Sequence, residues 1–125
     1  MVKYISPAGW NLLESVWTDD EVTVIAEEDD LVFEIGGILF LVQRNNGFNN
    51  IICNRITKSR MTLQEVIKEF RKVMIDQQIQ YIRVEGSSKR YIFLMKMLPR
   101  IFDNEVGIIK SDEIDNRNVF YIKCY

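Results

Sequence analysis

The chain has 125 residues, of which 47% are hydrophobic and 27% charged, and its formal net charge is −2. A chain of this length and apolar content buries about two-thirds of its unfolded surface, so it can fold without disulfides or a metal and is not intrinsically disordered. We expect a single domain over residues 1–125. The chain contains no histidine, which excludes Ser-His-Asp and Cys-His catalysis and any zinc site that contains histidine.

The two cysteines, Cys53 and Cys124, form no CxxC motif. This excludes a thioredoxin-type motif and a cysteine-based zinc site, and we expect two reduced thiols, with a single disulfide as the alternative. The N-terminal residues MVKYISPAGW lack the apolar core of a signal peptide, and no later segment is long and apolar enough to cross a membrane. We therefore expect a cytoplasmic protein that does not bind membranes.

The charges are unevenly distributed along the chain. Residues 1–54 carry nine acidic and two basic residues, residues 55–102 carry eleven basic and four acidic residues, and residues 103–125 have a net charge of −2. Such separation is typical of an anion-binding middle segment, or of segments that complement each other within one fold or across a homodimer. Solvated faces of strands and helices would give the same pattern.

In chain order, Ser6-Pro7 is a helix start, with Ser as the cap and Pro in the first turn. Trp10, Leu13 and Trp17 then recur at helical spacing, which predicts about three turns ending near Thr18.

Residues 21–43 alternate between apolar and polar, which predicts an antiparallel meander of three strands. The acidic residues 27–30 are its first predicted hairpin turn and Gly36-Gly37 its second. A turn at residues 45–47 then leads into a predicted fourth strand over residues 48–55.

Residues 62–77 form the clearest predicted helix, because Thr62 and Glu65 make a capping box ahead of an apolar stripe. A buried strand is predicted over residues 79–85, followed by a helix that Pro99 ends at Leu98. Two strands, near 105–110 and 118–124, complete the chain.

This order of elements predicts an α/β (α+β) fold: a mixed, mainly antiparallel sheet flanked by three helices. Over most of the chain it resembles the GNAT fold of the acyl-CoA-dependent N-acyltransferases. The resemblance implies that the fourth strand splays from the fifth and that acyl-CoA lies between them. The pyrophosphate of the cofactor would then rest on a glycine-rich turn at the start of the long helix.

The acyl-CoA motif of that family, R/Q-x-x-G-x-G/A, corresponds here to Arg55-Ile56-Thr57-Lys58-Ser59-Arg60. Arg55 fits, but Lys58 and Arg60 replace small residues, and their side chains obstruct the approach of phosphate to backbone N–H groups. Two interpretations remain open: Arg55, Lys58 and Arg60 hold a phosphate through charged contacts, or they form a solvated basic turn.

The second motif of the family is a late helix ending in a Tyr that protonates the departing thiolate, and Met97 occupies that position. A thioether cannot donate a proton, and Tyr91 in the same helix is expected to be a packed aromatic. Glu34 and Glu85 have no motif support as a general base. We expect a solvated turn at residues 27–30 in place of a cation site.

The resemblance therefore implies a non-catalytic GNAT-like interaction or accessory protein, similar to small GNAT-like proteins of bacteriophages and bacteria, which needs no cofactor. We expect a protein partner or a homodimer, formed through an apolar face around Trp10 and Trp17 or through edge-to-edge pairing of the final strand. The first alternative is a divergent N-acyltransferase that binds acetyl-CoA through Arg55, Lys58 and Arg60. The second is a nucleic-acid or polyanion binder that uses the basic residues 55–102.

Overall fold

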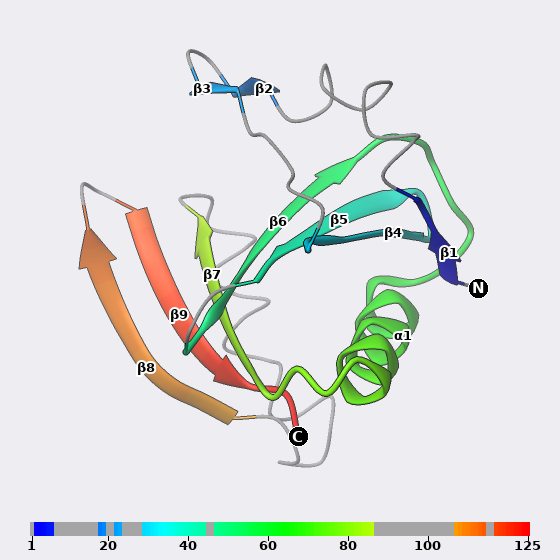
Figure 1. The fold of residues 1–125 in the computed structure, drawn as a ribbon. Coiled ribbons are helices and arrows are strands. Elements are labelled where there is room, and N and C mark those ends of the chain that lie inside the picture. Colours follow the sequence, from blue (N-terminus) through cyan, green and yellow to red (C-terminus); the bar gives the residue numbers. More distant parts are fainter. Residues whose placement is uncertain are drawn as a thin grey trace.

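The computed structural model (Figure 1) describes residues 2–6, 18–19, 22–23, 29–44, 47–86, 107–114 and 117–125. They form nine strands and one helix in a mixed α+β arrangement. The elements are β1 (Val2–Tyr4), β2 (Thr18–Asp19), β3 (Val22–Thr23), β4 (Leu31–Ile35), β5 (Ile38–Gln43), β6 (Asn49–Arg55), α1 (Leu63–Asp76), β7 (Tyr81–Gly86), β8 (Gly107–Ile114) and β9 (Arg117–Lys123).

Seven of these strands form one sheet in the order β1-β4-β5-β6-β7-β9-β8, while β2 and β3 form a separate two-stranded sheet. Neighbouring strands of the large sheet are antiparallel except β6 and β7, which are parallel. The chain leaves β6, forms α1 against one face of the sheet and returns as β7 (Figure 1). A mixed, mainly antiparallel sheet is therefore confirmed.

Several predicted elements are also confirmed. Gly36 and Gly37 turn between β4 and β5 with φ angles of +55° and +77°, values that favour glycine. The predicted fourth strand corresponds to β6, the capped helix to α1, and the later strands to β7, β8 and β9. The predicted helix before Pro99 and residues 7–17 of the opening helix lie outside the described residues. Of the opening helix, its predicted cap Ser6 lies in no helix or strand, and Thr18 begins β2. Of the three predicted helices, the described part of the chain thus contains α1.

The predicted meander over residues 21–43 is wrong at its first hairpin. β3 pairs with β2, and the outer neighbour of β4 is the N-terminal strand β1, with Val2 opposite Ile35. The prediction that the final strand pairs edge to edge is also wrong, because β9 lies between β7 and β8. Alternation of apolar and polar residues predicts that a segment is a strand. It does not predict whether that strand lies at the edge or in the interior of the sheet.

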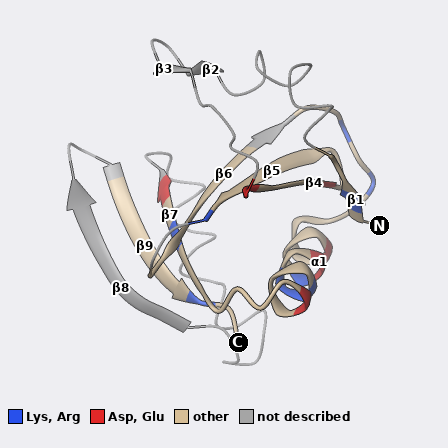
Figure 2. Cartoon of the chain, in the orientation of Figure 1, with Lys and Arg blue, Asp and Glu red and all other residues tan. Residues whose placement is uncertain are grey.

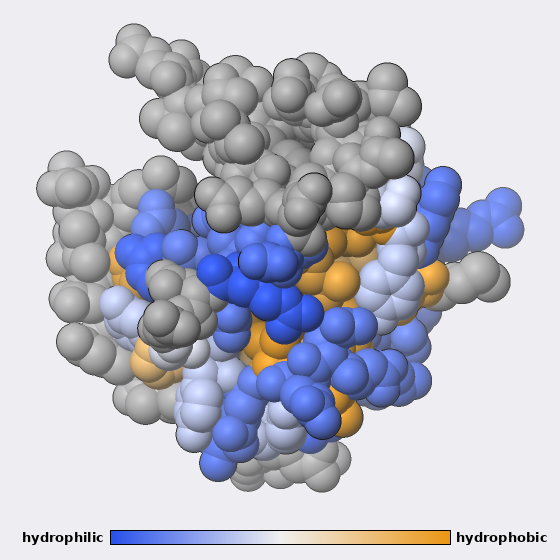
Figure 3. Space-filling model, in the orientation of Figure 1, coloured by the Kyte–Doolittle hydropathy of each residue, from blue (hydrophilic) through white to orange (hydrophobic). Residues whose placement is uncertain are grey.

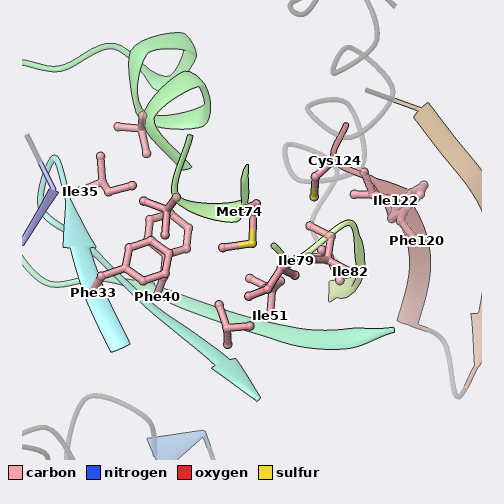
Figure 4. Close-up of a cluster of buried hydrophobic side chains, with 14 residues drawn as sticks. Phe33, Ile35, Phe40, Ile51, Met74, Ile79, Ile82, Phe120, Ile122 and Cys124 are labelled. Atoms are coloured by element: carbon pink, nitrogen blue, oxygen red, sulfur yellow. The ribbon is translucent and has the colours of Figure 1, made fainter. Parts of the chain in front are cut away.

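The main hydrophobic core fills the space between the sheet and α1. Phe33 and Phe40 stack with ring centroids 5.3 Å apart, and Phe70 of α1 lies 5.0 Å from Phe40. In Figure 4, Met74 lies between this aromatic pair and the side chains of Ile79 and its neighbours. Each fully buried side chain of this kind contributes about 1.5–3 kcal/mol, so this layer holds α1 on the sheet.

A second, smaller cluster occupies the opposite face of the sheet, where Val32, Leu39 and Leu41 are fully buried. Both faces of β4 and β5 are therefore covered, as in an interior pair of strands. On the face drawn in Figure 3, hydrophilic residues cover α1, and apolar residues reach the surface between the helix and strands β4 and β5. No helix within the described ranges is long and apolar enough to span a membrane.

Candidate functional site

The three predicted cofactor-binding residues lie on the connection from β6 to α1. Arg55 is the last residue of β6, where its backbone is opposite Ile38, and its side chain lies outside what the structure describes. Lys58 and Arg60 are exposed in the loop that follows, and Figure 2 shows these basic positions on the connection leading into α1. Lys58 and Arg60 thus lie in the loop that precedes α1, and their role in binding a phosphate stays a prediction.

The start of this loop is fixed by the turn between β4 and β5. The N–H groups of Ile56 and Thr57 both donate to the carbonyl oxygen of Gly37, at 2.8 and 3.2 Å. A Cβ atom on Gly37 would overlap the carbonyl oxygen of Thr57, so the close approach requires glycine. The loop therefore leaves the sheet in one defined direction.

Side chains at the start of α1 accept from one N–H group of its first turn and from one N–H group of the loop before it. The Glu65 N–H donates to Thr62 Oγ1 at 3.2 Å, the Thr62 hydroxyl donates to Glu65 Oε1 at 3.1 Å, and the Met61 N–H donates to Ser59 Oγ at 3.1 Å. N–H groups in the first turn of a helix are donors of the kind that cradle a phosphate. Here the Glu65 N–H is occupied and the Glu65 carboxylate lies in the same turn, which disfavours a pyrophosphate at this position.

Next to the loop, β6 and β7 run parallel and then diverge. They pair only over Asn49–Ile51 and Ile82–Val84, although β6 continues to Arg55 and β7 to Gly86. In Figure 1 the arrowheads of the two strands point apart. The chain therefore has a splayed parallel pair directly before the loop that carries Lys58 and Arg60.

A polar cluster that the sequence analysis missed lies across β6, β7 and β9, on the sheet face opposite α1. Arg83 donates to Asn50 Oδ1 at 3.3 Å and forms an ion pair with Glu85 at 3.0 Å. Burial by itself would lower the pKa of Arg83, but a hydrogen bond to Tyr121 and the contacts with Glu85 outweigh it and raise the pKa. Arg83 thus joins three strands, and Glu85 neutralises its charge.

The candidate general bases therefore have ordinary structural surroundings. Glu85 pairs with Arg83, and Glu34 is half-buried on β4, opposite Lys3 of the edge strand. Met97 and Tyr91 lie outside the described residues.

Of the acidic segment at residues 27–30, Asp29 and Asp30 are described, and both accept hydrogen bonds from Arg44. The Arg44 N–H donates to Asp30 Oδ1 and its Nε to the Asp29 carbonyl oxygen, both at 3.1 Å. The same guanidinium reaches Gln77 Oε1, at the end of α1, at 3.3 Å. Asp29 and Asp30 thus help to join the open end of the β4–β5 hairpin to the helix, and Glu27 and Glu28 lie outside the described residues.

Both cysteines are free thiols in different surroundings. Cys124 is buried, and desolvation raises the pKa of its thiol to about 12 even though Arg71 nearby acts in the opposite direction. The side chain of Cys53 on β6 is exposed, yet enough protein surrounds the sulfur for desolvation to raise its pKa as well. Within the described part of the chain, no group of three His, Cys, Asp or Glu residues could hold a metal ion.

Comparison of the chain with protein-family models, with curated proteins and with solved structures finds no match in any of the three.

Proposed function

We propose that this protein is a non-catalytic interaction or accessory module with a GNAT-like fold. The order of its elements supports the resemblance, because a splayed parallel strand pair is connected through a loop and a long helix. In the acyltransferases that this order resembles, acyl-CoA lies between such strands. In this proposal the chain keeps the order of helices and strands of those acyltransferases but neither binds acyl-CoA nor transfers an acyl group.

One observation carries the proposal: the turn that would hold the pyrophosphate is occupied by the chain's own groups. Thr62 and Ser59 accept from the N–H groups of Glu65 and Met61, and the Glu65 carboxylate lies in the first turn of α1. A pyrophosphate would have to displace these bonds and approach a negative charge. The interaction-module proposal requires no such displacement.

A divergent acyltransferase is the second candidate, and the exposed basic groups at the loop favour it. Lys58 and Arg60 are exposed on the loop that follows β6, where charged side chains could replace backbone contacts to phosphate. For nucleic-acid binding, the described part of residues 55–102 offers less support. There Lys72 pairs with Glu69 and Arg83 with Glu85, so part of the basic charge is neutralised.

A thermal-shift titration with acetyl-CoA and CoA tests the proposal. A ligand present at about 100 times its dissociation constant adds about 2.7 kcal/mol of stability, a shift of several degrees for a domain of this size. We expect no dose-dependent shift with either compound. A shift that disappears in the triple variant Arg55→Ala, Lys58→Ala, Arg60→Ala would show that these residues bind CoA and would overturn the loss of acyl-CoA binding. The same thermal-shift measurement with a single-stranded oligonucleotide, at low and at moderate salt, tests the nucleic-acid-binding candidate.

A further inference from the structure

We draw no further inference here: the strongest candidate, the cluster of the Phe48, Tyr81 and Tyr121 rings on the sheet face opposite α1, leaves Tyr81 exposed, but nothing in the structure shows what covers it.

Discussion

Gly37 is the residue on which the geometry of the candidate loop depends most directly. It has a φ angle of +77°, and its carbonyl oxygen accepts from both Ile56 and Thr57. A side chain at this position would overlap the Thr57 carbonyl oxygen. The same residue thus forms the β4–β5 turn and sets the path of the chain from β6 to α1.

Replacing Gly37 with Ala should therefore lower the free energy of unfolding by more than the backbone strain of a positive φ angle alone. A non-glycine residue in the left-handed region costs about 1–2 kcal/mol, and displacement of the loop adds to it, so we expect a loss of about 2–4 kcal/mol in the free energy of unfolding. Urea denaturation measures it. Gly47→Ala is the control, since φ there is +108° but nothing lies within 4 Å. Equal losses at the two glycines would contradict the role of the Thr57 contact.

Cys124 makes stability depend on pH in the alkaline range. Burial raises the pKa of its thiol from the ordinary value of 9.0 to about 12, so between these values the unfolded chain loses a proton that the folded chain keeps. The free energy of unfolding should then fall as pH rises above about 9, by up to about 1.4 kcal/mol per pH unit from this group. Below about pH 9 the thiol is protonated in both states and contributes no slope.

The measurement is urea denaturation at several pH values for the wild type and for Cys124→Ala. Because tyrosines and lysines titrate in the same range, the prediction concerns the difference in slope between the two proteins. The variant should be less stable at pH 7, from the lost packing, and should show the shallower decline above pH 9. Parallel slopes would mean that the thiol does not stay protonated in the folded state.

At the scale of elements, α1 depends on its N-terminal cap as well as on its apolar stripe. Val66, Val73 and Met74 are buried against the sheet, while Thr62 and Glu65 exchange hydrogen bonds at the start of the helix. The cap also consumes N–H groups that a phosphate would need. In the proposed function, the cap that stabilises the helix is also the feature that keeps the Glu65 N–H from a phosphate.

Replacing Thr62 with Ala should remove the cap at a cost of about 1 kcal/mol, measured by thermal or urea denaturation. Thr62→Ser keeps the hydroxyl oxygen and should stay within about 0.5 kcal/mol of the wild type. The Ala variant also frees the Glu65 N–H. If it gained affinity for acetyl-CoA, the cap would be the feature that keeps acyl-CoA out. A Ser variant as unstable as the Ala variant would show that the hydroxyl does not act as a cap.

At the scale of the whole molecule, long side chains connect parts of the fold that are distant in sequence. Arg71 of α1 donates to the Cys124 carbonyl oxygen at 2.9 Å, and Gln80 donates to the Tyr125 carbonyl oxygen at 2.8 Å. The Cys124 N–H also donates to the Gln80 carbonyl oxygen at 2.7 Å. Helix α1 and the segment after β9 are thereby held at the same end of the sheet.

Replacing Arg71 with Met keeps the apolar stem and removes the donor, so we expect a loss of about 1 kcal/mol. Amide hydrogen exchange should accelerate at Cys124 more than at residues within β4 and β5. Lys68→Met on the exposed side of α1 is the control and should change stability by less than about 0.5 kcal/mol. If exchange at Cys124 were unchanged in the Arg71 variant, this hydrogen bond would not be what anchors the segment.

Local patterns in the sequence were sufficient for the β4–β5 hairpin, for β6 and for α1 with its cap, because each depends on residues close together in the chain: alternation, a glycine pair, a capping box. They also placed Lys58 and Arg60 in the loop between the fourth predicted strand and the capped helix. Only the tertiary structure decided that β1 borders β4, that β9 is an interior strand, that β6 and β7 diverge after Ile51, and that Arg83 joins three strands. It also decided that Cys53 is exposed and Cys124 buried. The physical reason is that strand pairing joins residues far apart in sequence, and the apolar pattern of a strand does not encode its neighbours.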